Sequence, residues 1–415
     1  MTAPVTPRSS NTGSRGARQL ALLGLVELLA MGLWFSASAV VPELREAWGL
    51  DDSGAAWLTT SVQLGFATGA VLSALLTLSD VWDPRRLIAG SALLGAAATA
   101  AIAIFAEGLA LAVVLRFATG VALAGVYPPG MKIVVGWFRA GRGTAIGILI
   151  GALAVGSATP HLLRPLRGIG AWQPVLLLAS GLAVIAAILA ATGLRAGPYQ
   201  VPAAPFDPRA VRRIFADRAT MLANGGYFGH MWELYGMWTW IPAFLAASFA
   251  ADASADTSPS LASYLAFGVI AAGGAGAVAA GVLADRVGRT AVTSWSMVVS
   301  GTCCLAIGPL FGGPIWPVAA VCLVWGFAIV ADSAQFSTCV SELAEPEYVG
   351  TALTLQTAIG FLLTVATIRL IPVWEATLGW EWAFAPLAIG PALGTWSMLA
   401  LRRRPEAARI ADGRR

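Results

Sequence analysis

Apolar stretches long enough to cross a bilayer recur along the whole chain, with short polar segments between them. A helix needs about 20 mostly apolar residues to span the hydrocarbon core. The charged fraction agrees with this, because soluble domains are about 25% charged, whereas 12% of these 415 residues are charged and 57% are hydrophobic. The sequence therefore predicts an all-α polytopic membrane protein and argues against a soluble domain.

Twelve of these stretches are expected to be transmembrane helices. They cover approximately residues 19–41, 55–79, 87–106, 109–136, 144–165, 172–194, 219–247, 261–283, 290–311, 316–343, 351–372 and 382–401. The first follows a polar leader, continues past the length of a signal peptide and has no convincing small-residue cleavage site. We therefore expect it to be retained as a helix.

Arginine marks alternate connections between these spans, and acidic residues dominate most of the others. Because cytoplasmic loops carry the excess of Lys and Arg, this pattern places both termini in the cytoplasm, in a multi-pass protein of the cell (inner) membrane. Arg164 and Arg167 are the main exception. The expected division is a cytoplasmic leader, an N-terminal six-helix bundle, a cytoplasmic central loop, a C-terminal six-helix bundle and a cytoplasmic tail, at residues 1–18, 19–195, 196–218, 219–401 and 402–415.

The two halves carry a short similar segment. AGRGTAIGILIGA follows the fourth span and EYVGTALTLQTAIG follows the tenth, with Gly-Thr-Ala at residues 143–145 and 350–352 in matching places. Internal repeats around a midplane site are the usual construction of secondary transporters. The similarity indicates a duplicated six-helix unit.

A nine-residue loop after the eighth span carries the strongest motif. The sequence GVLADRVGR, residues 281–289, resembles the G-x-L-A-D-R-x-G-R signature of the major facilitator superfamily, and the matching first-half loop, LTLSDVWDPRR, keeps an acid and two arginines. The resemblance implies twelve transmembrane helices in two pseudo-symmetric six-helix bundles, with this loop as a conformational gate. The implied gate residues are Asp80, Arg85, Gly281, Asp285, Arg286, Gly288 and Arg289.

The gate residues also have a direct physical interpretation. An acid at a helix end can pair with an arginine or cap the N-terminus of a neighbouring helix. Asp285 stands beside Arg286 and Arg289, and the two flanking glycines permit a close approach and a tight turn. We expect this cluster to hold the two bundles together on the inner face.

The central ionisable residues fall in the first, fourth, seventh and tenth spans. A charged group at bilayer depth costs roughly 2.5–3.5 kcal/mol, so it faces the bundle interior or a water-filled cavity. In the family that the chain resembles, these four spans line the central cavity, and helical spacing adds neighbours such as Trp34 to the face of Glu27. The predicted substrate and proton cavity consists of Glu27, Trp34, Arg116, Tyr127, Tyr227, His230, Glu233, Trp238, Asp332 and Gln335.

Each of these charged groups also has a structural interpretation. Glu27 can pair with Arg116, and His230 can form a fixed hydrogen bond with Glu233. Asp332 can be a protonated acid that serves helix packing. Trp232 is expected to point away from the cavity face.

The sequence carries no phosphate-binding loop of the G-x-x-x-x-G-K-[ST] type, nucleophile motif or metal-ligand cluster, so we expect neither an enzyme nor an ATP-driven transporter. We expect a secondary active transporter that moves a small solute by alternating access, through proton-coupled symport of a small organic or inorganic anion. Arg116, with Lys132, would attract the anion, and a buried carboxyl would take up the proton. The alternative is a proton-coupled drug or metabolite efflux antiporter, which the buried acids and the aromatic residues favour.

The expected partners are a small-molecule substrate and the lipid bilayer, with no nucleic acid, and the protein is expected to be a monomer. No metal and no cofactor are expected, since a proton gradient is the energy source.

Overall fold

The computed structural model describes residues 10–78, 82–138, 141–166, 171–199, 209, 211–252 and 259–414, and every regular element in them is a helix. The elements are α1 Ser10–Met31, η1 Ser38–Val40, α2 Val41–Trp48, α3 Asp52–Leu75, α5 Pro84–Phe105, α6 Leu109–Leu123, α7 Tyr127–Trp137, α8 Arg142–Leu166, α9 Gln173–Gly193, α10 Val211–Ala216, α11 Arg218–Ala251, α12 Pro259–Val287, α13 Arg289–Ala306, η3 Gly308–Leu310, α14 Ile315–Ala331, α15 Ser333–Leu343, α16 Val349–Leu378, α17 Trp380–Ala383, η4 Ala385–Ala388, α18 Ile389–Arg402 and η5 Pro405–Gly413. Asp80 and residues 200–208 of the expected central loop lie outside the described residues.

Ten helical segments of the described chain are long and apolar enough to cross a membrane, which confirms the helical membrane fold. They are α3, α5, α6 with α7, α8, α9, α11, α12, α14 with α15, α16, and α17 with α18. The other two expected spans correspond to α1 and α13, which fall outside these ten. α1 opens with a polar stretch and ends at Met31, and α13 has 18 residues that include Arg289 and several Ser and Thr, so both are less apolar than the others.

Aspartates set the starts of three of the long helices. Asp51 accepts a hydrogen bond from the Gly54 backbone N–H at 2.7 Å at the start of α3, and Asp217 accepts one from Thr220 at 3.1 Å at the start of α11. At the start of α5, Asp83 accepts from the backbone N–H two residues ahead, with a proline in the first turn. Such caps satisfy backbone donors that have no partner within the helix.

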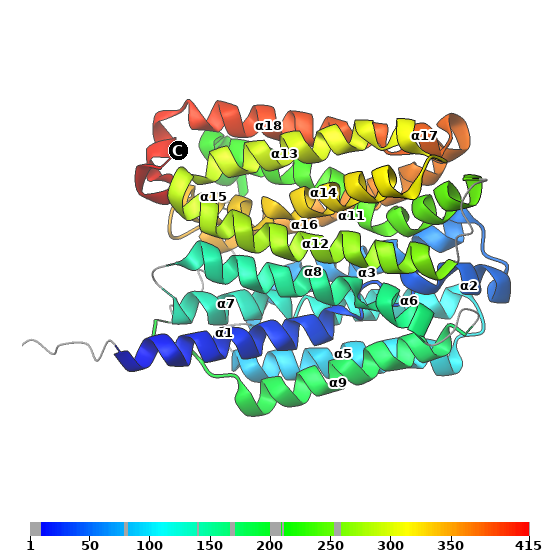
Figure 1. Ribbon diagram of the computed structural model, residues 1–415. Helices are drawn as coiled ribbons and strands as arrows, with labels where there is room; N and C mark the ends of the chain where they lie inside the picture. Colours follow the sequence, from blue (N-terminus) through cyan, green and yellow to red (C-terminus); the bar gives the residue numbers. More distant parts are fainter. Residues whose placement is uncertain are drawn as a thin grey trace, which may run out of the picture.

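The helices form two groups that lie side by side along one seam. Figure 1 shows α1 to α9 on one side of the molecule and α11 to α18 on the other. The seam is formed by α8 against α12 and by α3 against α16. The start of α1 and the C-terminal η5 lie at the same end, here called the terminal end, and α2 and α17 lie at the opposite, distal end (Figure 1).

The seam between α8 and α12 is packed at backbone distance. A Cβ placed on Gly147 would lie 2.6 Å from the carbonyl oxygen of Ala277, and one on Gly151 would lie 2.9 Å from that of Gly274. Small residues spaced four apart let two helices approach this closely within a membrane. In the sequence this contact corresponds to glycines that recur every four residues, at positions 143, 147 and 151.

Candidate functional site

Three of the four spans predicted to line the cavity are interrupted. α1 ends at Met31, and residues 32–37 form turns before η1. α6 ends at Leu123 and α7 begins at Tyr127, while Asp332 alone separates α14 from α15. Non-helical backbone at membrane depth is tolerated only where protein buries it or where it lines a cavity, and interrupted helices are where transporters place their sites. The interruptions therefore mark the candidate site.

Arg116 of α6 forms hydrogen bonds with the backbone at the interruption in the first span. Its guanidinium donates to the backbone carbonyls of Leu33 at 2.8 Å, Leu58 at 3.0 Å and Trp34, and to the Ser36 hydroxyl at 3.3 Å. The carbonyls just after a helix C-terminus have no intrahelical donor, and a cation there is favourable. Arg116 is fully buried, and no carboxylate is among these partners. The predicted structural pair of Glu27 with Arg116 is therefore wrong.

Glu27 of α1 is fully buried, and neither of its carboxylate oxygens has a hydrogen-bond partner within the described residues. Its carboxylate faces the first turn of α7, where a Cβ on Gly130 would lie 3.5 Å from Oε2. Tyr127, the first residue of α7, interacts with it electrostatically. An isolated buried carboxylate is very costly, and adding a proton removes most of that cost.

Glu233 of α11 is buried among three hydrogen-bond donors from the second half. The Trp325 indole N–H donates to Oε1 at 2.6 Å, Cys304 Sγ lies 3.2 Å from the same oxygen, and the Ser300 hydroxyl donates to Oε2 at 2.9 Å. These donors come from α13 and α14. Glu233 thus connects three helices of one half. The sequence suggested a hydrogen bond between Glu233 and His230, but none of the hydrogen bonds of Glu233 in the described residues goes to His230.

His230 instead pairs with the residue that interrupts the tenth span. Its Nδ1 lies 2.9 Å from Asp332 Oδ1, and its Nε2 lies 3.0 Å from the Ser333 hydroxyl. Both members of the pair are 2% exposed. Tyr227, one turn earlier on α11, and Phe336 of α15 place their rings within 6.3 Å of one another and of the His230 ring.

A double-mutant cycle on His230→Gln and Asp332→Asn is expected to show a coupling of about 1–3 kcal/mol, because the two groups are in direct buried contact. The cycle is measured as the free energy of unfolding in mixed detergent micelles. His230→Gln combined with Glu233→Gln serves as the comparison, since these side chains do not bond to one another, and its coupling should be smaller. Additive effects in the first cycle would contradict the pairing.

An aromatic layer lies across the seam at the middle of the molecule. Trp34 stacks on Tyr235 with ring centroids 5.5 Å apart, and Phe66 and Phe361 approach to 4.4 Å. Trp238 packs edge-on against Phe35 and Tyr235, beside the same layer. The predicted cavity residues Trp34 and Trp238 are thus placed at the centre, but they are about 1% exposed and fill the space instead of lining it.

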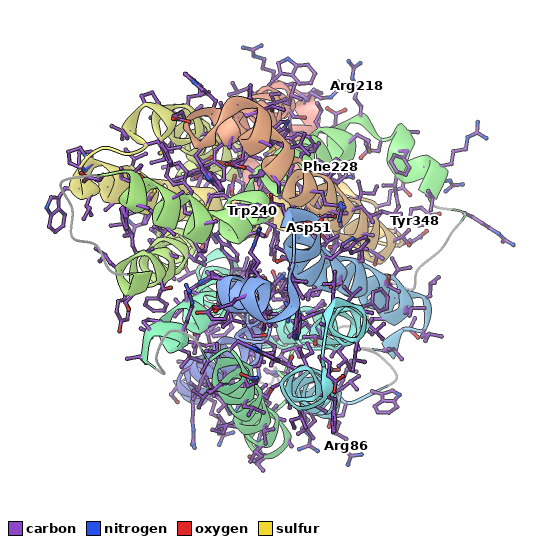
Figure 2. All side chains as sticks on the ribbon, turned by 90° about the vertical axis from the view of Figure 1, so that its right-hand side faces the viewer. Asp51, Arg86, Arg218, Phe228, Trp240 and Tyr348 are labelled. Atoms are coloured by element: carbon purple, nitrogen blue, oxygen red, sulfur yellow. The ribbon has the colours of Figure 1, made fainter. Side chains whose placement is uncertain are left out.

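A cavity with a volume of about 550 Å³ lies at the distal end, between the two groups of helices. None of the ten predicted cavity residues lines it, because its walls come from the outer ends of the helices. Figure 2 looks onto this end, with Trp240 and Asp51 near the middle of the bundle. The lining residues include Pro42, Arg45, Asp52, Arg164, Trp240, Ser263, Glu375 and Trp380.

Arginine side chains at the distal end connect the two groups of helices through hydrogen bonds to serine hydroxyls. Arg164 of α8 donates to Glu43 of α2 at 2.8 Å and to the Ser263 hydroxyl of α12 at 3.0 Å. Arg369 of α16 donates to Ser53 at 3.0 Å. The sequence marked Arg164 only as an exception to the charge pattern of the loops, and its role in the seam depends on contacts that no local pattern shows.

The gate motif lies at the terminal end of the seam. A Cβ on Gly143, at the start of α8, would lie 2.6 Å from the Asp285 carboxylate, so this acid lies against a helix N-terminus, which is one of the two arrangements that the sequence left open. Gly288 has a φ of 97°, which favours glycine, and it begins α13. Arg286 is exposed, and Arg85 pairs with neighbouring Asp83 at 2.7 Å.

Arg289 makes a second connection at the terminal end. It donates to both oxygens of Glu342 at 2.8 and 3.1 Å and to Gln335 Oε1 at 3.0 Å. Gln335 was predicted to line the substrate cavity, but its carbonyl is held by this gate arginine. Glu342 Oε2 also accepts from the Ala411 backbone N–H of η5 at 3.0 Å, which joins the C-terminal segment to the gate.

The described residues hold no group of three or more His, Cys, Asp or Glu side chains placed to bind a metal ion. All four cysteines are buried and unpaired with one another. The titratable groups at the centre are therefore arranged in separate clusters around Glu27, Glu233 and the His230–Asp332 pair.

Comparisons with known proteins agree with this architecture. The family model described as Major Facilitator Superfamily matches residues 23–368. The uncharacterized transporter YgaY of Escherichia coli, in strain K12 and in O157:H7, is 26% identical over 181 residues, or 42% of this chain. The match covers 44% of the length of each relative. Since the family model covers most of the chain, this protein belongs to the Major Facilitator Superfamily, a family of transporters.

Proposed function

We propose that the protein is a monomeric secondary transporter with twelve transmembrane helices, in which α1 and α13 complete the ten more apolar spans. The two six-helix bundles comprise residues 19–195 and 219–401, joined by the central loop. The arginine-rich connections support a cytoplasmic location for both termini in the cell (inner) membrane. In this arrangement the terminal end faces the cytoplasm, and the distal cavity faces outward.

Proton coupling is assigned to Glu27, and its environment is the observation that carries this proposal. The side chain is fully buried without a hydrogen-bond partner in the described chain, beside the interruptions in the first and fourth spans. In this conformation the neutral acid is the stable form, since no donor compensates a charge. Rearrangement of the interrupted helices would admit water and release the proton, which links protonation to conformation.

The buried titratable groups that are free to meet a solute are mostly acids, and this favours the efflux antiporter over the anion symporter. The anion hypothesis requires Arg116 as a ligand, but its guanidinium is occupied by three carbonyls and a hydroxyl. The remaining titratable groups at the centre are three carboxyls and one histidine, and aromatic rings lie beside them. Such surroundings suit an apolar or cationic solute. We therefore place this protein among proton-coupled exporters of small organic solutes.

The test uses purified protein in proteoliposomes with an imposed pH gradient and ethidium as a cationic probe. Wild-type protein is expected to accumulate ethidium against its gradient. Glu27→Gln should reduce gradient-driven accumulation at least about tenfold, because an amide cannot take up or release the proton, and proton transfer by a positioned side chain contributes at least this factor to a rate. It should retain exchange of ethidium at equal pH, since the neutral amide resembles the protonated acid.

Glu347→Gln is the matched control, because Glu347 is exposed at the terminal end. It should transport like the wild type. Undiminished pH-driven accumulation by Glu27→Gln would exclude Glu27 as the proton carrier. Uptake of benzoate in place of ethidium would instead favour anion symport.

A further inference from the structure

The distal cavity combines apolar walls with a small number of charges. Its volume of about 550 Å³ lies within the range of sites for small organic molecules, about 300–1,000 Å³. Apolar surface comes from Val41 and Pro42 on one side of the seam and from Pro242, Ala243 and Pro372 on the other. A molecule bound there would contact both groups of helices.

Four charged residues line this cavity, namely Arg45, Arg164, Asp52 and Glu375, and the first three are held in ion pairs. Arg45 pairs with Asp52, and Arg164 pairs with Glu43, so each arginine already has its own acid. The carboxylate of Glu375, on α16, lines the cavity and has no ion-pair or hydrogen-bond partner in the described part of the chain. Among the charged residues of the lining, Glu375 is therefore the one whose carboxylate is available to a ligand.

Two tryptophans line the same cavity. Trp240 of α11 is held in place by its indole N–H, which donates to the Ile368 carbonyl at 2.8 Å, and Trp380 of α17 packs edge-on against Phe244 with ring centroids 5.9 Å apart. Tryptophan is the best aromatic partner for a cation positioned over its ring. The rings are fixed before any ligand arrives, so little side-chain entropy is lost on binding.

The aromatic layer separates this cavity from the buried acids. Trp34, Phe66, Tyr235 and Phe361 are each at most 6% exposed and close the seam at the middle of the molecule. A ligand in the distal cavity therefore does not contact Glu27, Glu233 or Asp332. The cavity is a site of its own in this conformation.

We propose that the distal cavity binds a monovalent organic cation with an apolar body, with the Glu375 carboxylate as its counter-ion and Trp240 and Trp380 as its aromatic walls. The proposal rests on the proposed function in that this cation belongs to the class of solute we assign to the transporter. It places the first contact of that solute outside the aromatic layer.

The test measures equilibrium binding to the full-length protein in nanodiscs of neutral lipid, without any gradient. The probes are tetraphenylphosphonium and its isosteric anion tetraphenylborate, with binding to empty nanodiscs subtracted. Wild-type protein should bind the cation more tightly than the anion. Glu375→Gln should weaken cation binding about two- to fivefold, as expected for one partly exposed charge, and Glu375→Arg should reverse the preference between the two ions.

Glu46→Gln is the matched control, because Glu46 is exposed on α2 at the same end and does not line the cavity. It should bind both ions like the wild type. Equal affinity for the two ions, or unchanged cation binding in Glu375→Gln, would overturn the proposal. Because Glu27→Gln should still bind tetraphenylphosphonium, undiminished proton-driven transport by that variant together with intact binding would count against the proposed function alone.

Discussion

Arg116→Ala is expected to destabilise the protein by about 1–3 kcal/mol, because a buried carbonyl left without a donor costs about this much. The Trp34 carbonyl would lose the guanidinium as its donor, whereas the Leu33 carbonyl keeps the Ser36 hydroxyl at 2.9 Å and Leu58 lies within the continuous helix α3. The turn after α1 would also lose the side chain that joins it to α3 through Leu58. The measurement is the thermal unfolding midpoint of the purified protein in detergent, together with its yield as a monodisperse species.

Two further variants separate this structural role from a role in binding an anion. Arg116→Lys keeps the charge but loses the planar fork, so it should recover only part of the stability. Arg86→Ala removes an exposed arginine and should leave the midpoint unchanged. If Arg116→Ala has the same thermal unfolding midpoint as the wild type and loses only transport, Arg116 instead binds the transported solute.

Gly281→Val is expected to open the terminal end of the seam. A Cβ at this position would lie 2.5 Å from the Gly143 carbonyl oxygen, so the valine cannot be accommodated unless α8 and α12 move apart. Overpacking of this kind costs roughly 1–3 kcal/mol, and that energy shifts a two-state equilibrium by about 5- to 150-fold. The population with the terminal end closed should fall accordingly.

Spin labels at Arg142 and Leu283 provide the measurement, because both side chains are exposed and flank the contact between α8 and α12. Their distance distribution in nanodiscs should become longer in Gly281→Val. The four native cysteines are buried, so labelling can be directed to the introduced sites. Gly268→Val is the matched control on the same helix, where a Cβ would meet its nearest neighbour at 3.8 Å. A distribution that does not change in Gly281→Val would show that this contact does not govern closure.

Most of the helices and their order could be predicted from the sequence, because the apolar length of a segment is a local property. The differences are at α1 and α13, where polar residues weaken the apolar signal, and at the interruptions. The turn over residues 32–37 carries no proline, so the sequence predicted one continuous helix there. The interruption before α7 was easier to anticipate, since Pro128 and Pro129 follow it directly.

The candidate site could be predicted only as a set of residues. All five central ionisable groups are buried, but their partners differ from those suggested by spacing. Glu233 is three residues from His230 on the same helix, but it binds Trp325, and His230 binds Asp332. The distal cavity was missed altogether, because residues such as Glu375 and Arg45 belong to loops and helix ends with no motif.

The sequence by itself determined the membrane class, the succession of apolar helices, the gate motif and the identity of the ionisable groups inside the bundle. These follow from composition and short-range spacing, since transfer of a segment into lipid depends on its own residues. Only the tertiary structure decided which groups meet, that Arg116 serves the backbone, and where the open cavity lies. Those contacts join residues up to 316 positions apart, as in Arg369 and Ser53, and they depend on the rotation, depth and interruption of helices packed against one another.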